Sequence, residues 1–203
     1  TILVPLDDPG VSRQVYSSAG AHLTQRGSIF FDEVRVPLNH RVGEEGAGFI
    51  HAMTAFDYNR AVIALGCIGT ALQSLDETIE HAKVRIAFGK PLARHEGVAF
   101  QISEHLSMLH AARLLAYRVL ALADAGEPHT MEAAMVKWLG PKAAVEAIHA
   151  SMLLHGWAGY GHDLPFAQRL ADTIGLEVGD GTPEIMKGIV AREVFGRDFS
   201  AYR

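Results

Sequence analysis

From Phe49 to the end of the chain, apolar residues recur at the spacing of α-helices, in segments separated by Gly and Pro. Long helices joined by short connections favour an antiparallel bundle of about four helices. Pro141 falls inside one of these segments and is expected to kink it. The expected helices are Phe49 to about Arg85, about Val98 to Asp124, Met131 to His155, about Pro165 to Leu176, and Pro183 to Phe195.

The first 41 residues have the character of β-strands instead. Ile2–Val4 is an apolar run closed by Pro5, and two further runs, Gly27–Phe31 and Val34–Val36, carry β-branched or aromatic residues. So few strands do not make an independently stable sheet. The chain also begins without an initiator Met, so we expect a fragment whose sheet is completed upstream. The predicted domains are 1–41, the end of a β-domain, and 42–203, a helical bundle.

Composition narrows the class of protein. The 203 residues carry a net charge of −5 with a pI near 6.1, which argues against a nucleic acid or an anionic membrane as partner. Cys67 is the only cysteine, so no intrachain disulfide is available and a reducing, cytoplasmic setting is expected. The longest apolar run, Ala61–Leu72, is too short to span a bilayer, and no signal peptide opens the chain.

Three stretches could carry chemistry, and each has a structural alternative. Lys83–Pro91, with Arg94 beyond it, gathers cations and an aromatic ring, as a phosphate-bearing ligand would require. The same cations could instead offset the dipole at a helix end. Leu153–Gly161 places glycines among aromatics, which suits either a flat ligand or a helix C-cap followed by a packed turn.

The third stretch is Val178–Ile185. Asp180 stands between two glycines, either as a turn residue or as a carboxylate directed into a cleft as a base. Thr182 is a good N-cap and Pro183 suits the first helical position.

Other catalytic motifs are missing from the sequence. The segment Gly43–Gly48 is glycine-rich but acidic and would repel a phosphate. Eleven histidines are present without metal-ligand spacing, so no metal site is expected, and there is no Gly-x-Ser-x-Gly motif.

Taken together, these segments resemble the acyl-CoA dehydrogenase family over essentially the whole chain. The segments Arg85–Leu92 (RIAFGKPL) and Gly179–Met186 (GDGTPEIM) are similar to two specific signatures of that family. Gly27–Pro37, Gly43–Phe49 and Asp57–Arg60 are similar to the end of its β-domain, the following loop and its substrate-lining helix. The resemblance implies a mainly α fold, a C-terminal four-helix bundle preceded by the last strands of a β-domain.

The same resemblance implies roles for individual residues. Asp180 stands where the family keeps the base that takes the α-proton of an acyl-CoA, and its backbone N–H is expected to stabilise the enolate. Tyr58, Asn59, Arg60 and Gly181 would line the acyl-CoA site. Six residues are expected to contact FAD: Arg85, Phe88, Gly156, Thr182, Pro183 and Glu184. Of these, Arg85 and Phe88 would reach the FAD of a neighbouring subunit.

Such enzymes form homodimers or homotetramers and pass electrons to an electron-transfer flavoprotein, so both partners are expected.

A carboxylate that takes the α-proton needs a water-poor site, because desolvation can raise a carboxyl pKa by up to about 3–5 units. Most family members carry Glu where this chain has Asp180, whose side chain is shorter by one C–C bond, about 1.5 Å. In carrying Asp at this position the chain resembles dehydrogenases that act on alicyclic acyl-CoA esters. A cyclic or branched acyl group is the resulting hypothesis. An oxidase of the same superfamily, acting on acyl-CoA or nitroalkanes, and a non-catalytic scaffold stay open as alternatives.

Overall fold

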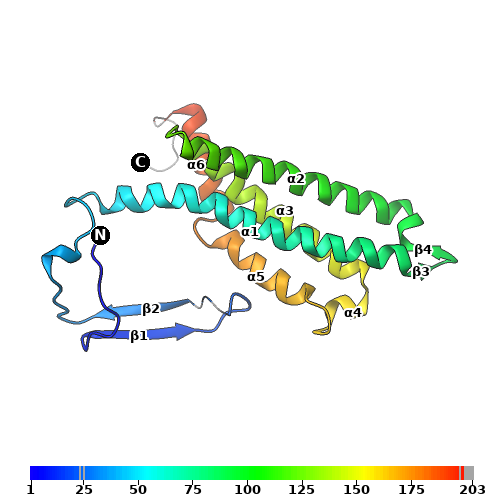
Figure 1. The fold of residues 1–203 in the computed structure, drawn as a ribbon, viewed down its shortest axis with the longest axis horizontal. Helices are drawn as coiled ribbons and strands as arrows, with labels where there is room; N and C mark the ends of the chain where they lie inside the picture. The colour runs from blue at the N-terminus through cyan, green and yellow to red at the C-terminus, as the bar shows by residue number, and fades with distance from the viewer. Residues whose placement is uncertain (23, 25, 197, 199–203) are drawn as a thin grey trace. The chain divides into compact units, whose positions relative to one another are not determined.

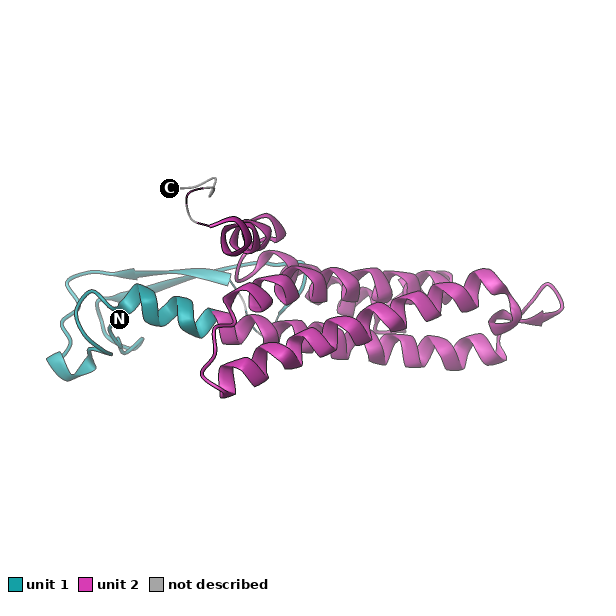
Figure 2. Ribbon diagram, turned by 90° about the horizontal axis from the view of Figure 1, so that it is seen from above, with its two compact units in different colours: residues 1–56 teal, residues 57–203 magenta. Residues whose placement is uncertain are grey.

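The computed structural model describes residues 1–22, 24, 26–196 and 198, which form two compact units, Thr1–Phe56 and Asp57–Arg203 (Figure 2). The division falls inside the first long helix, which begins in one unit and continues through the other. The domain boundary predicted between residues 41 and 42 stays a prediction.

The first unit is built on an antiparallel hairpin. Strand β1 (Val11–Tyr16) pairs with β2 (Arg26–Phe31) in a register that sets Val11 opposite Phe31 and Tyr16 opposite Arg26. Ile2 makes an isolated bridge to Arg41, and a 3-10 turn, η1 (Leu38–His40), precedes the helix. Apolar side chains of the hairpin, including those of Phe30 and Phe31, are about half exposed. The hairpin therefore presents an uncovered apolar surface.

The strand expected at Val34–Val36 is not formed in the structure. The chain turns at Glu33, whose φ of +50° is left-handed, and Pro37 then removes a backbone donor. The partner of β2 is instead the polar segment Val11–Tyr16, which lacks the alternation that reveals a half-buried strand. Pairing was decided by the turn before β1, where Asp8 accepts the N–H of Val11 at 2.9 Å.

The predicted helices are confirmed to within two residues at each end (Figure 1). They are α1 (Gly48–Val84), α2 (Glu96–Asp124), α3 (Thr130–Leu154), α5 (Phe166–Val178) and α6 (Pro183–Phe195). One turn, α4 (Trp157–Tyr160), was not predicted, and α3 continues through Pro141 as one helix. Between α1 and α2 lie a two-residue hairpin, β3 (Ile86–Ala87) and β4 (Lys90–Pro91), and a 3-10 turn, η2 (Leu92–Arg94).

Helices α1 and α3 run parallel and in fixed register. Asp57 accepts a hydrogen bond from Thr130 near the start of the pair, and His81 stacks on His155 at its far end. Between these points the two backbones come close, because a Cβ on Gly140 would lie 2.8 Å from that of Ala64. The core between the long helices is rich in alanine: Ala61, Ala64, Ala71, Ala112, Ala116, Ala133, Ala144 and Ala147 are all buried. Small side chains are what permit this approach.

Helices α1 and α2 are long and apolar enough to cross a bilayer by length and composition. The sequence argument above counted only the uninterrupted run Ala61–Leu72, which is shorter than either helix. Several apolar residues of α1, among them Ala61, Ala64, Cys67 and Ile68, pack in the bundle core. The absence of a membrane partner stays a prediction.

Gly140→Ala is expected to lower the free energy of unfolding by about 1–3 kcal/mol, because its Cβ would overlap the backbone-attached Cβ of Ala64. Gly188→Ala is the matched control on the exposed side of α6, where a Cβ meets nothing within 4 Å. That change should raise stability by roughly 0.5–1 kcal/mol through helix propensity. Denaturant unfolding measures both, and equal effects would contradict the close α1–α3 approach.

Candidate functional site

Asp180 lies on a four-residue connection between α5 and α6 that leaves the helical conformation abruptly. Gly179 caps α5 through its N–H to the Gly175 carbonyl at 3.0 Å, and Asp180 and Gly181 then take φ values of +56° and +114°. A left-handed residue other than glycine costs about 1–2 kcal/mol, and Asp tolerates that conformation better than most residues. The carboxylate of Asp180 is exposed in the described chain.

Lys137 of α3 lies under this connection and is fully buried. Its ammonium donates to the carbonyl of Leu176 at 2.8 Å and to that of Gly181 at 3.1 Å. Desolvation lowers the pKa of Lys137, while the nearby Cys67 and Asp180 oppose that shift. A cation inside the bundle thus holds both sides of the turn that carries Asp180.

Of the four residues predicted to line the substrate site, the three on α1 divide between surface and interior. Tyr58 and Asn59 are exposed, whereas Arg60 is only 7% exposed and donates to Asp57 at 2.6 Å. Asp57 also accepts from Thr130 at 2.6 Å, so this carboxylate joins α1 to the start of α3. The Nε of Arg60 is buried without a partner among the described residues. The substrate-lining role stays a prediction for all three.

The residues predicted beside the flavin ring form the start of α6. Thr182 is the N-cap, although its hydroxyl accepts the Ile185 N–H only at a long 3.5 Å. Pro183 occupies the first helical position and Glu184 the first turn, where a negative charge is favourable. These three follow directly after Asp180 and Gly181, so the structure brings the predicted base and these contacts together.

The other predicted FAD contacts gather at the opposite end of the bundle. A hollow of about 490 Å³ is lined by Arg85, Gly156 and Trp157 together with His81, Leu92, Leu153, Leu154, His155 and Ala158. Gly156 has a φ of +65° and turns the chain from α3 into α4. Arg85 supplies a permanent cation, and the Trp157 ring is 86% exposed. A cation beside an exposed ring fits an anionic ligand that also carries a ring, as FAD does.

Phe88 stands beside that hollow at the tip of the β3–β4 hairpin. Phe88 and Gly89 both have positive φ, +50° and +77°, as a two-residue hairpin turn with matched twist requires. Phe88 is 97% exposed, and its ring approaches the His95 ring edge-on, with centroids 6.3 Å apart. The hairpin therefore presents an exposed aromatic side chain.

His81 and His155 form the floor of the hollow. Their rings stack with centroids 4.2 Å apart, and His155 also packs on Phe166 at 4.5 Å. Because the Ser151 carbonyl can only accept, Nδ1 of His155 must donate in their 2.8 Å bond. Burial lowers the pKa of His81, helped by His155 and Arg85, so His81 is neutral near pH 7.

The two groups of predicted FAD contacts lie far apart in one chain. Lys137 is bonded beside Asp180, whereas Leu154 lines the hollow at the other end of the same helix. From Lys137 to Leu154 a helix rises about 26 Å, at roughly 1.5 Å per residue. A flavin ring at Asp180 cannot touch Arg85 of its own chain.

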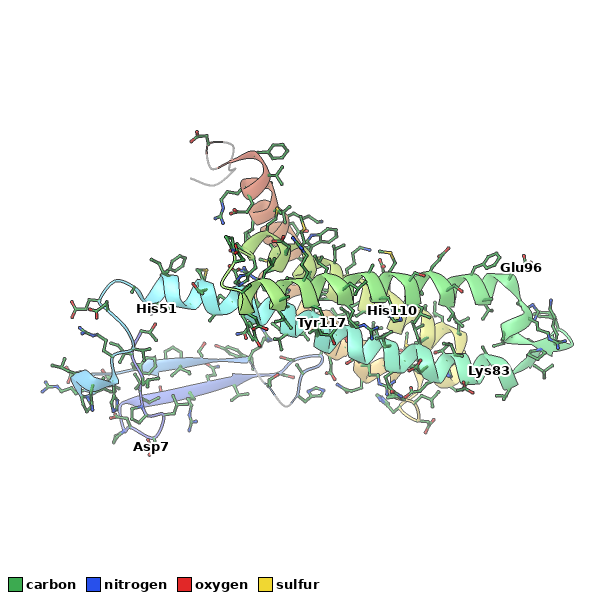
Figure 3. All side chains as sticks on the ribbon, turned by 45° about the horizontal axis from the view of Figure 1, so that its top comes forward. Asp7, His51, Lys83, Glu96, His110 and Tyr117 are labelled. Carbon is green, nitrogen blue, oxygen red and sulfur yellow. The ribbon has the colours of Figure 1, made fainter. Side chains whose placement is uncertain are left out.

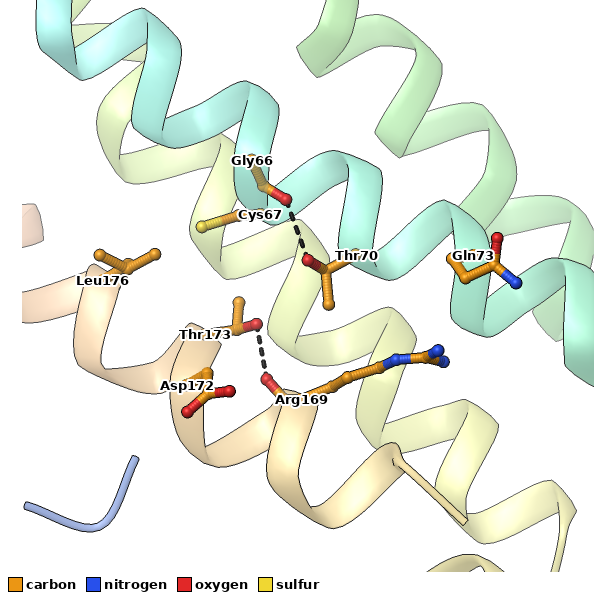
Figure 4. A pocket seen from close by; sticks show the side chains of 8 residues that line it. All are labelled: Gly66, Cys67, Thr70, Gln73, Arg169, Asp172, Thr173 and Leu176. Atoms are coloured by element: carbon orange, nitrogen blue, oxygen red, sulfur yellow. Dashed lines mark hydrogen bonds between the residues drawn. The ribbon is translucent and has the colours of Figure 1, made fainter. Parts of the chain in front are cut away.

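A second hollow, of about 420 Å³, lies between α1 and α5 and contains none of the predicted site residues (Figure 4). It is lined by Gly66, Cys67, Thr70, Gln73, Arg169, Asp172, Thr173 and Leu176. Arg169 binds Glu77 through two hydrogen bonds of 2.6 and 3.0 Å. Burial raises the pKa of the Cys67 thiol to about 11. The Arg169–Glu77 pair joins α5 to α1.

Sequence reasoning missed Lys137, His81 and His155. Lys137 left one signal: it is the only charged residue in the otherwise apolar stretch Ala133–Gly140. The two histidines left none, because their pairing depends on the parallel register of α1 and α3.

Comparison with known proteins shows which family this chain resembles in sequence and in fold. The family described as "Acyl-CoA dehydrogenase, C-terminal domain" matches residues 46–195. The chain is 34% identical over 197 residues to acryloyl-CoA reductase (NADH) of Anaerotignum propionicum, covering 97% of this chain and 50% of that protein. It is 32% identical over 193 residues to cyclohexane-1-carbonyl-CoA dehydrogenase of Geobacter metallireducens, covering 95% and 51%.

Among solved structures, PigA with FAD and proline superposes with a TM-score of 0.92 at 26% identity, over 97% of this chain and 51% of that one. The chain thus spans about half the length of the curated relatives it matches.

Native Cys67 is expected to resist thiol reagents at pH 8, since with a pKa of about 11 only on the order of one molecule in a thousand is a thiolate. Labelling followed by mass spectrometry should give no adduct until denaturant is added. Rapid stoichiometric labelling of the folded protein would contradict the burial of this thiol.

The Glu77–Arg169 pair predicts a pH dependence of stability. The hydrogen bond from Arg169 lowers the pKa of Glu77 in the folded protein below its ordinary value of 4.5. The contribution of this pair to the free energy of unfolding is therefore complete above pH 4.5, and it is lost as the pH falls through the pKa of Glu77 in the folded protein. Urea unfolding below about pH 4.5 should therefore show a smaller loss of stability in Glu77→Gln than in the wild type. Glu80→Gln, on the exposed side of the same helix, should keep the wild-type profile.

Proposed function

The chain belongs to the acyl-CoA dehydrogenase family, and we propose that it is the C-terminal half of an enzyme that desaturates an acyl-CoA thioester between its α and β carbons. The observation that carries this proposal is Asp180, presented on a strained turn that a buried cation holds. Strain of this kind concentrates at functional sites.

Asp180 is the proposed base for the α-proton. Its carboxylate is exposed in the described chain, so the water-poor site must be completed by the acyl-CoA, the flavin and protein outside these residues. The backbone N–H of Asp180 is proposed to donate to the thioester carbonyl, where negative charge develops as the proton leaves. Tyr58, Asn59, Arg60 and Gly181 are the proposed lining of the acyl-CoA site.

FAD is the proposed cofactor, held between two copies of the protein. Thr182, Pro183 and Glu184 would lie beside the flavin ring of their own subunit, while Arg85 and Phe88 would reach the FAD of the neighbour. Gly156 is a further proposed FAD contact. FAD, when bound, supplies the acceptor for the hydride that leaves the β-carbon. The separation of about 26 Å between the two groups supports this arrangement, because it leaves each group only half of a flavin site.

A homodimer or homotetramer follows from that arrangement. Helix α2 supports it with exposed apolar side chains: Phe100, Met108, Leu114 and Tyr117 are between 55% and 70% exposed, and Figure 3 labels Tyr117 on this helix. Aromatic residues and Met are enriched at protein–protein interfaces. The cytoplasm is the proposed location.

A cyclic or branched acyl group is the proposed substrate. Asp is shorter than the Glu of most relatives by one C–C bond, about 1.5 Å, so the reacting carbon must lie closer to the backbone. Gly179 leaves space beside the turn, with only the Gly175 carbonyl within 4 Å of a Cβ. The likeness to a cyclohexane-1-carbonyl-CoA dehydrogenase supports this proposal.

An electron-transfer flavoprotein is the proposed electron acceptor. The superfamily also contains oxidases, and peroxide formed under air without an added acceptor would identify the protein as one. A full-length protein that holds no flavin would instead support a scaffold role.

Asp180→Asn is expected to slow anaerobic bleaching of the bound flavin by acyl-CoA at least about a hundredfold, because removing a general base costs about 10²–10⁴ in rate. The visible spectrum should still show bound flavin. Asp124→Asn, an exposed carboxylate on α2, is the control and should behave as wild type. If the flavin of Asp180→Asn were bleached at the wild-type rate, Asp180 would not be the base.

A further inference from the structure

Lys137 is a fully buried lysine whose ammonium bonds two main-chain carbonyls of a single turn. The Leu176 carbonyl lies in the last turn of α5, where carbonyls lack an intrahelical N–H partner. The Gly181 carbonyl lies just before the cap of α6. Asp180 stands between these two points, so one side chain from α3 fixes both ends of the segment that carries it.

The burial of a charge here is costly and calls for a reason. Lysine is almost never fully buried without a partner, and an apolar side chain of similar length would fill the same space at lower cost. The groups that face the ammonium come from three elements: Cys67 and Arg60 from α1, Glu177 from α5, and Asp180 from the turn. Asp180, Glu177 and Cys67 favour the charged form of Lys137, and Arg60 disfavours it.

The turn itself needs support from outside. Asp180 and Gly181 both have positive φ, and a Cβ on Gly181 would lie 2.4 Å from the buried Met186 methyl. Such conformations persist only where surrounding structure holds them. The two hydrogen bonds from Lys137 supply that support from inside the bundle, while Asp180 itself is exposed.

We propose that Lys137 is the positioning residue for Asp180, fixing its turn from inside the bundle. This rests on the proposed function, in which Asp180 takes a proton from the substrate. Lys137 does not touch the substrate. It acts through the backbone carbonyls of Leu176 and Gly181, on either side of Asp180.

Lys137→Met in the full-length protein with FAD tests the proposal, because Met keeps most of the length and removes the donors and the charge. Lys142→Met is the matched control: it lies on the same helix but is exposed and pairs with Glu146. Anaerobic flavin bleaching by cyclohexanecarboxyl-CoA is followed against substrate concentration.

For Lys137→Met, the limiting bleaching rate at pH 7 should fall at least about tenfold, since misplacing a reacting group by about 1 Å can cost a hundredfold. The half-saturating acyl-CoA concentration should stay within roughly twofold. Lys137→Arg, which keeps N–H donors at this position, should recover part of the lost rate. An unchanged limiting rate in Lys137→Met would overturn the proposal.

Hydrogen exchange of the amides around residues 179–182 gives a readout that needs no substrate. Exchange there should be at least about tenfold faster in Lys137→Met than in Lys142→Met, because a turn without its anchor opens more often. If no acyl-CoA bleaches the wild-type flavin but this exchange still accelerates, the proposed function fails and the anchoring role stands. Unchanged exchange defeats the anchoring role.

Should Lys137→Met fail to hold flavin, Lys137→Gln, which keeps hydrogen-bonding capacity, takes its place in the same measurements. Loss of flavin in both variants, with Lys142→Met intact, would mark Lys137 as a residue of global stability and overturn the proposal.

Discussion

Close packing of α1 against α3 determines where the rest of the helical unit can lie. Gly140 faces Ala64 with no space for another methyl group, and alanines continue this contact along both helices. The parallel register that results joins Asp57 to Thr130 at one end and stacks His81 on His155 at the other. The residues predicted to have functional roles lie on these two helices, in the hairpin that follows α1, or in the turns and the helix that come after α3.

Buried charge is concentrated at one end of that pair. Arg60 and Asp57 pair with each other within α1, Asp57 also accepts from Thr130 of α3, and Lys137 donates to carbonyls at the end of α5 and in the turn after it. Polar groups placed in this way restrict the helices to one arrangement, because any shift leaves a charge unpaired. The exposed carboxylate of Asp180 thus stands on a rigid support while the opposite end presents Phe88 and Trp157 to the outside.

The sequence predicted the helices and part of the candidate site, but it did not predict the strand pairing or the residues that meet from distant segments. The helices followed from period and from Gly or Pro stops, so their ends were predicted to within two residues. Strand pairing was harder, because β1 is a polar segment and its partnership with β2 depends on the turn at Asp8. The base and the α6 contacts lie within eight residues of one another and could be named together. Lys137 could not be named from the sequence, because the carbonyls that it binds, those of Leu176 and Gly181, lie about 40 residues further along the chain.

The sequence by itself determined the helical class, the family and the candidate base, because these depend on local periodicity and on short contiguous signatures. Only the tertiary structure decided that Arg60 is buried while Tyr58 and Asn59 are exposed, and that Lys137 lies beneath Asp180. It also decided that the two groups of predicted flavin contacts occupy opposite ends of one chain. The physical reason is that burial and electrostatic partnership are set by helix register, and register is a property of packed surfaces that no local stretch of residues encodes.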